Sequence, residues 1–102
     1  MKITQTTNGD QVLVAVEGSL DSSESHKLEN VLNDILNGKR VNLVIDFSKL
    51  EYLSSSGLRV LLGAQKMTNE SIGNLVIKNV NPDIMEIFKL TGFSDFLNIE
   101  SE

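Results

Sequence analysis

Hydrophobic and polar positions over the first twenty residues follow the pattern of two β-strands. Residues 2–7 and 11–17 are strand-like runs, and Asn8-Gly9-Asp10 separates them. Asn-Gly between such runs is a strong signal of a β-hairpin, because glycine readily adopts the backbone angles of a tight turn. We therefore predict that the chain opens with two antiparallel strands.

Two later segments place apolar residues at the spacing of an amphipathic helix. The first covers residues 22–37, where Asp21 and Glu24 offer a start similar to a capping box and Gly38 offers a stop. The second covers residues 56–69 and has a broad apolar face. Both segments are predicted to be helices that cover a sheet.

A third helix is predicted from its capping residues. Asn81 is a suitable N-cap, Pro82 suits the first helical position, and Asp83 places an acid in the first turn. The helix is expected to run to about Thr91, and Gly92 ends it.

The remaining strands are predicted from short apolar runs. Residues 41–47 are nearly all apolar, which favours a strand in the middle of the sheet with both faces covered. Residues 75–80 form the next strand, and residues 96–99 a short edge strand. The order ββαβαβαβ predicts one α/β domain over residues 1–102, with about three helices on a mixed sheet in which only the opening hairpin must be antiparallel.

Composition narrows the classes of function. The chain has 102 residues, no cysteine and a formal net charge of -5. Lys39-Arg40 is the only adjacent basic pair, so we expect no direct binding to nucleic acid. No apolar run approaches the roughly 20 residues of a membrane-spanning helix, so we expect no membrane insertion and a cytoplasmic protein.

The residues do not favour an enzyme. Ser55 has Leu53 rather than glycine two positions before it, and the only histidine, His26, precedes it in the chain. One histidine without cysteine does not make a nitrogen-and-sulfur metal site. We therefore expect no catalytic residue, metal or cofactor. Four acids are interpreted as helix caps or surface residues: Asp10, Asp34, Asp83 and Asp95.

Asp46 stands at the end of the predicted central strand and Asp21 in the turn after the second strand, so both are expected at one rim of the sheet, near the serine loop. This placement rests on the fact that parallel strands end on the same side. A structural interpretation also stays open, in which Asp21 caps the first helix and Asp46 fixes its loop through backbone hydrogen bonds.

Three consecutive serines, Ser54, Ser55 and Ser56, stand where the second helix begins. They are suited to forming a turn and capping the helix. A phosphate there would also gain from the amides of the helix N-terminus, while adding about -1.5 to -2 charges to a surface. Both interpretations stay open from the residues alone.

Four segments along essentially the whole chain, in the same order, resemble the STAS domain, specifically the bacterial anti-sigma factor antagonists. The serine-glycine segment is the most specific of them. The segments are Gly18-Ser19-Leu20-Asp21, Asp46-Phe47-Ser48, Tyr52-Leu53-Ser54-Ser55-Ser56-Gly57-Leu58 and Leu90-Thr91-Gly92-Phe93.

The resemblance implies a switch protein that, when unphosphorylated, binds an anti-sigma factor of the histidine-kinase-like ATPase type and so frees the sigma factor. The same partner is then implied to be a serine kinase, and a PP2C-type phosphatase reverses the modification. Motif position places the phosphorylated serine at Ser55, with Ser56 and Ser54 less favoured. The implied partner contacts are Asp21, Ser54, Ser55, Ser56 and Gly57.

The chain departs from the family pattern at one position. Many members have an aspartate immediately before the phosphorylated serine, and this chain has Ser54. Two other functions also stay open: a non-switching STAS scaffold in a lipid-transport ABC complex or a stress-signalling assembly, and a sensor that binds a nucleotide at the rim of the sheet. The sequence favours the switch because a stand-alone domain carries an acceptor serine.

Overall fold

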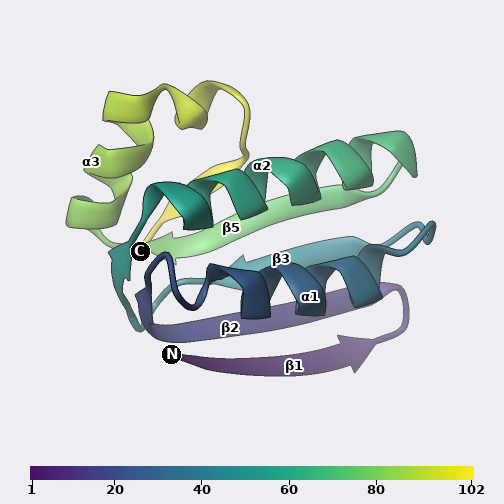
Figure 1. Cartoon of the computed structure of the whole chain (residues 1–102). Coiled ribbons are helices and arrows are strands. Elements are labelled where there is room, and N and C mark those ends of the chain that lie inside the picture. Colours follow the sequence, from purple (N-terminus) through teal and green to yellow (C-terminus); the bar gives the residue numbers. More distant parts are fainter.

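The computed structural model describes residues 1–102 and places three helices on a mixed β-sheet. Figure 1 shows α1 (Ser25–Leu36) and α2 (Ser55–Glu70) side by side along one face of the sheet, with α3 (Pro82–Thr91) after the end of β5. A short 3₁₀ helix, η1 (Phe93–Asp95), follows α3. The strands are β1 (Lys2–Asn8), β2 (Gln11–Leu20), β3 (Asn42–Asp46), β4 (Leu50–Leu53), β5 (Asn74–Val80) and β6 (Ile99–Ser101).

The strand order confirms the predicted α/β fold. The sheet runs β1-β2-β3-β5-β6, and β4 pairs with the last residues of β2. Only the β1–β2 hairpin is antiparallel, and every other pair is parallel. The strand predicted to lie in the middle of the sheet, β3, does so.

The prediction that both faces of β3 are covered is wrong. Leu43 and Ile45 are buried under the helices, whereas Val44 and Asp46 on the opposite face are only half-buried. The chain moves in one direction across the sheet from β2 to β3 to β5. Right-handed crossovers in one direction put α1 and α2 on the same face, so the other face stays uncovered.

Several elements also differ from prediction. The second strand continues to Leu20 rather than ending at residue 17. The first helix begins at Ser25 rather than residue 22, because the carbonyl oxygen of Asp21 accepts hydrogen bonds from the N–H groups of Glu24 and Ser25 and closes a separate turn. The short strand β4 was not predicted. The last strand is Ile99–Ser101 rather than 96–99, because η1 and the buried Leu97 occupy the preceding residues.

The third helix agrees with its prediction at both ends. The Asn81 side chain accepts a hydrogen bond from the Ile84 N–H at 2.9 Å, and Pro82 is the first helical residue. Gly92 ends the helix with a φ of 79°, in the left-handed region. None of the helices is both long and apolar enough to span a membrane.

The carboxylate of Asp46 connects the ends of β3 and β5. Its Oδ1 accepts hydrogen bonds from the Ser48 N–H at 2.9 Å and from Nδ2 of Asn79 at 3.0 Å. Partial burial raises the pKa of Asp46, but the hydrogen bonds from Asn79 and Ser48 outweigh it and hold the pKa below its ordinary value of 3.8. The predicted role of Asp46 in fixing its loop is confirmed.

The lowered pKa makes a prediction about acid stability. A carboxylate whose pKa is lower in the folded state stabilises the fold above its unfolded pKa, and this stabilisation is lost as the pH falls through the folded value. We expect Asp46→Asn to keep the two hydrogen bonds while removing this proton linkage. Urea unfolding between about pH 6 and pH 2 is the measurement, and the free energy of unfolding should fall less steeply below about pH 4 in the variant than in the wild type. Parallel curves would contradict the assignment.

Candidate functional site

The site lies where β2 and β4 end side by side. Ser19 pairs with Tyr52 and Leu20 with Leu53, in parallel. The Ser54 N–H then donates to the Leu20 carbonyl oxygen at 2.9 Å. Because Asp21 and Ser54 directly follow two paired residues, the β2–α1 turn and the start of α2 emerge next to each other.

Ser54 is the N-cap of α2. Its backbone is extended, with φ -84° and ψ 167°, and its Oγ accepts a hydrogen bond from the Gly57 N–H at 3.1 Å. The residue is only 7% exposed. This geometry satisfies one of the amides that have no partner within the helix, and it removes the Ser54 hydroxyl from the surface.

The next two serines differ in exposure. Ser55 is exposed, whereas Ser56 is half-buried. Both stand in the first turn of α2, where the backbone N–H groups have no carbonyl partner four residues earlier in the helix. Ser55 is therefore the one exposed serine of the three, and it lies at the positive end of the helix.

Gly57 allows α2 to begin directly on top of the paired strand ends. A Cβ atom at this position would lie 2.9 Å from Cγ of Leu20 and 2.9 Å from Cδ1 of Leu53. Both leucines are buried in the core, at 0% and 3% exposure, so neither has space to move away. The close approach requires glycine.

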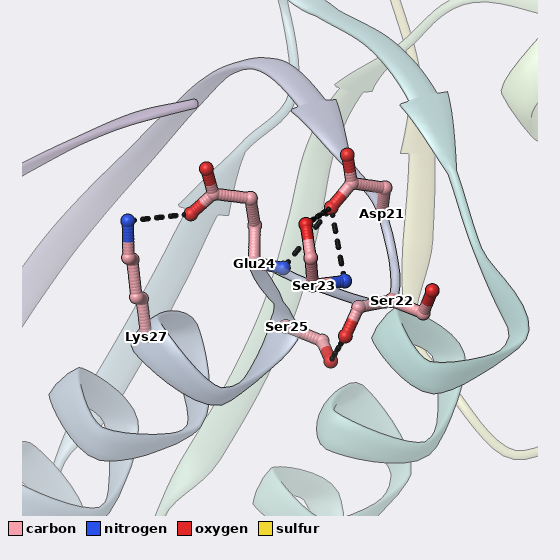
Figure 2. Close-up of polar contacts among 6 residues, drawn as sticks. All are labelled: Asp21, Ser22, Ser23, Glu24, Ser25 and Lys27. Carbon is pink, nitrogen blue, oxygen red and sulfur yellow. Dashed lines mark hydrogen bonds and ion pairs between the residues drawn. The ribbon is translucent and has the colours of Figure 1, made fainter.

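The β2–α1 turn is organised around one oxygen of Asp21, as Figure 2 shows. Oδ1 of Asp21 accepts three hydrogen bonds, from the Ser23 hydroxyl at 2.8 Å, the Glu24 N–H at 3.0 Å and the Ser23 N–H at 3.1 Å. The other carboxylate oxygen points away from the turn. Asp21 thus caps the turn before α1 and still offers one oxygen for outside contacts.

These contacts keep the turn negatively charged. The hydrogen bond from the Ser23 hydroxyl lowers the pKa of Asp21 most, and burial opposes it. The backbone N–H groups of Glu24 and Ser23 also lower this pKa, so it lies below its ordinary value. Glu24 is paired with Lys27 at 2.8 Å, and this contact lowers the pKa of Glu24. At neutral pH both acids are ionised, and only Glu24 has a cation beside it in this turn.

The structure brings together the residues that the sequence grouped as one site, with one exception. Asp21 and the segment Ser54–Gly57 meet at the ends of β2 and β4. Asp46 does not reach them, because β3 stops alongside Ala15, five residues before Leu20 on β2. At about 3.3 Å per residue, that separation is roughly 16 Å. The expectation that Asp46 lies near the serine loop is wrong.

Tyr52 is a site residue that the sequence analysis did not single out. It lies on β4, opposite Ser19, and 51% of it is exposed. Exposed tyrosines often contribute strongly to protein interfaces. The only signal for Tyr52 in the sequence was its position just before the serine segment. The direction of its side chain depends on the strand β4, which was not predicted.

The site is a surface and not a cavity. The hollows in the protein surface are lined by other residues, none of them Asp21 or a member of Ser54–Gly57. No group of three or more histidines or acids is arranged to hold a metal ion. What the site offers is an exposed hydroxyl, a carboxylate oxygen and an aromatic ring on rigid supports.

The packing of Gly57 predicts opposite effects for two glycines of the same helix. Gly57→Ala should lower the free energy of unfolding by about 1–3 kcal/mol, because the new methyl group clashes with Leu20 and Leu53. Gly63→Ala, where nothing lies within 4 Å, should raise it by about 0.5–1 kcal/mol. Urea unfolding of both variants tests this pair, and equal stabilisation would show that α2 does not contact the strand ends closely.

The capping geometry predicts a difference between neighbouring serines. Ser54→Ala should lower the free energy of unfolding by about 1 kcal/mol, because it removes the acceptor for the Gly57 N–H. Ser55→Ala should change it by less than about 0.5 kcal/mol, because the side chain is exposed. Thermal unfolding distinguishes the two, and a larger loss at Ser55 would reverse the assignment of the cap.

Comparison with known proteins agrees with the fold and with the family that the sequence resembles. Residues 2–102 match the family described as STAS domain. The chain is 30% identical over 93 residues to "Putative anti-sigma factor antagonist BtrV" of Bordetella bronchiseptica, covering 91% of this chain and 80% of that protein. It is 27% identical over 92 residues to the anti-sigma-B factor antagonist of Listeria monocytogenes, covering 90% and 81%.

Solved structures of SpoIIAA from Bacillus share the fold. The unphosphorylated form has a TM-score of 0.83 and the phosphorylated form 0.77, each at 17% identity and covering 99% of this chain. The matched regions are 90% and 93% of those chains. The family model spans nearly every residue and confirms the resemblance found in the sequence, so this chain belongs to the STAS domain family.

Proposed function

We propose that the protein is an anti-sigma factor antagonist whose binding to its partner is ended by phosphorylation of Ser55. The relatives at 27–30% identity bear the name of antagonist, which supports the class of function. The observation that carries the choice of residue is the exposure of Ser55, beside a Ser54 whose hydroxyl is buried and used as a helix cap.

The proposed modification is a phosphoryl transfer from ATP. The Ser55 Oγ attacks the γ-phosphorus, its proton passes to a base of the kinase, and ADP leaves. The kinase is the anti-sigma factor itself, an ATPase with serine kinase activity. A PP2C-type phosphatase then hydrolyses the phosphoserine with water and releases inorganic phosphate.

The position of Ser55 suits a switch that leaves the fold intact. A phosphate on this residue lies at the N-terminus of α2, where the free N–H groups of the first turn and the helix dipole stabilise negative charge. Arg59 is exposed one turn further along the same helix face and is a suitable counter-ion. The phosphorylated domain is therefore expected to stay folded.

The same phosphate changes the binding surface. It adds about -1.5 to -2 charges to the rim that also carries the ionised Asp21 and, opposite Ser19 on β2, the exposed Tyr52. A partner that buries this area in its unmodified state then has to desolvate two neighbouring negative groups, which is costly. Binding should be lost through charge and desolvation.

The aspartate that many relatives have before the phosphorylated serine is compatible with this proposal. Serine and aspartate are both good N-cap residues. Ser54 fills the capping role here, with its Oγ 3.1 Å from the Gly57 nitrogen. The departure from the family pattern therefore removes a charge beside Ser55 without removing the cap.

The proposal is tested with variants at Ser55. Ser55→Ala and Ser55→Asp are used as bait in native cytoplasmic lysate, and bound proteins are identified by mass spectrometry. We expect an ATPase-type anti-sigma factor with the alanine form and its loss, by at least about tenfold, with the aspartate form. Ser94→Asp, which adds the same charge at an exposed serine of η1, is the matched control and should bind as the wild type does.

Two results would contradict the switch. Equal recovery of a transporter or signalling assembly with both Ser55 variants would make the protein a scaffold. Loss of the thermal unfolding transition in Ser55→Asp would mean that Ser55 is structural.

A phosphorylation assay tests the choice of serine. With the purified kinase and ATP, phosphate should be incorporated into Ser54→Ala and Ser56→Ala but not into Ser55→Ala.

A further inference from the structure

One side-chain hydroxyl, that of Ser23, adds to the backbone hydrogen bonds that close the β2–α1 turn. It donates to Oδ1 of Asp21 at 2.8 Å, the shortest of the three hydrogen bonds that this oxygen accepts. The other two come from the N–H groups of Ser23 and Glu24. The carbonyl oxygen of Asp21 accepts two further bonds, from the N–H groups of Glu24 and Ser25. Backbone donors thus close the turn without the hydroxyl, which acts only on the carboxylate.

The three donors determine the direction of the Asp21 carboxylate because all of them contact the same oxygen. The terminal torsion of an aspartate has a broad energy profile, so donors on one oxygen decide where the other faces. Oδ2 makes no hydrogen bond within the domain, and Figure 2 shows that it points away from the turn. Asp21 therefore presents one free oxygen in a defined direction.

The same hydroxyl has the largest effect on the ionisation of Asp21. Its hydrogen bond is the main cause that holds the pKa of this carboxyl below the ordinary value of 3.8. The charged groups nearby contribute less. Glu24 is paired with Lys27 at 2.8 Å, and the terminal amino group of Met1 lowers the pKa of Asp21 only as the smallest of the causes. Ser23 thus favours the ionised carboxylate more than any charged neighbour does.

We propose that Ser23 is a positioning residue for partner binding, whose hydroxyl holds the Asp21 carboxylate so that its outward oxygen accepts a hydrogen bond from the partner. This role rests on the proposed function, because it takes the rim with Asp21 and Ser55 as the binding surface. A side chain that is held in its bound orientation loses less freedom on association. The Ser23 hydroxyl is itself occupied by Asp21, so it acts through the carboxylate.

Ser22 offers a matched control in the same turn. It is exposed and stands between Asp21 and Ser23 in the chain. Its side chain makes no hydrogen bond in Figure 2, and only its carbonyl oxygen accepts one, from the Ser25 hydroxyl. Ser22→Ala therefore removes a hydroxyl from the turn without changing the donors on Asp21.

Isothermal titration calorimetry tests the proposal, with the purified anti-sigma factor recovered on the Ser55→Ala bait and with ADP in place of ATP to prevent phosphorylation. Ser23→Ala should weaken binding by about fivefold, whereas Ser23→Thr, which keeps the hydroxyl, and Ser22→Ala should bind as the wild type does. All three should unfold near the wild-type temperature, because the backbone bonds of the turn remain. Equal affinity of Ser23→Ala and the wild type, or an equal loss in Ser22→Ala, would overturn the proposal.

Asp21→Asn separates positioning from direct contact. Asparagine keeps an oxygen for the three donors of the turn, but it then directs an amide NH₂ group outward, toward the partner's donor. In this background the Ser23 hydroxyl holds the side chain in an unfavourable orientation, so Ser23→Ala should weaken binding no further. The same fivefold loss in both backgrounds would show that Ser23 contacts the partner itself, and it would overturn the positioning role.

The isolated domain gives a measurement that needs no partner. The carboxyl carbon of Asp21 is followed by NMR while the pH falls from about 6 to about 2. Because the main cause of the lowered pKa is removed, Asp21 should titrate at a higher pH in Ser23→Ala than in the wild type and in Ser23→Thr. An unchanged titration would mean that the hydroxyl does not hold the carboxylate, and it would overturn the proposal.

Two outcomes distinguish this role from the proposed phosphorylation switch. Equal binding of Ser55→Asp and Ser55→Ala, together with weak binding of Ser23→Ala, would exclude the switch and support the positioning role. A loss of binding in Ser55→Asp, together with wild-type affinity of Ser23→Ala, would support the switch and exclude the positioning role.

Discussion

The parallel pairing of Leu20 with Leu53 is the constraint on which the candidate site depends. It places the ends of β2 and β4 side by side, and the Ser54 N–H extends the pairing by one bond to the Leu20 carbonyl oxygen. Both leucines are buried, and the first turn of α2 packs directly on their side chains. This close packing is possible because Gly57 has no Cβ, and the Ser54 side chain caps the turn. Ser54 and Gly57 thus face the protein interior, whereas Ser55 between them is exposed.

The turn of Asp21 depends on the same pairing. Asp21 is the first residue after Leu20, and its Oδ1 is held by the Ser23 hydroxyl and two backbone N–H groups. These donors stabilise the ionised carboxylate. Hydrogen bonds hold both the negative turn and the positive helix end in place. The proposed phosphorylation of Ser55 would therefore change the charge of this surface without unfolding the domain.

The one-sided arrangement of the helices has a second consequence. Successive right-handed crossovers in one direction leave β3 and β5 uncovered on one face and leave β1 without a neighbour at its outer edge. The rim that carries Ser55 and the free edge along β1 belong to different parts of the sheet, because Ser55 follows β4 whereas β1 pairs only with β2.

Local signals in the sequence predicted much of the fold. The hairpin turn at Gly9-Asp10, the Asn81 cap with Pro82, and Gly92 after α3 act within a few residues, and the hairpin, the cap and the helix end were all predicted. The helical spacing of Leu28, Leu32 and Ile35 predicted α1, whose three leading residues were misassigned because Asp21 caps a turn rather than the helix. The strand β4 was missed because its four residues pair only with the far end of β2, which no local pattern records.

The sequence by itself determined the α/β class, the hairpin, the three helices and the serine segment, because these depend on side-chain periodicity and on capping groups close in the chain. Only the tertiary structure decided which serine is exposed, that Asp21 joins the serines while Asp46 stops short of them, and which sheet edge is free. Each of these depends on strand register and on which face the helices cover. Register and handedness arise from contacts between residues far apart in the chain, and a local pattern does not contain them.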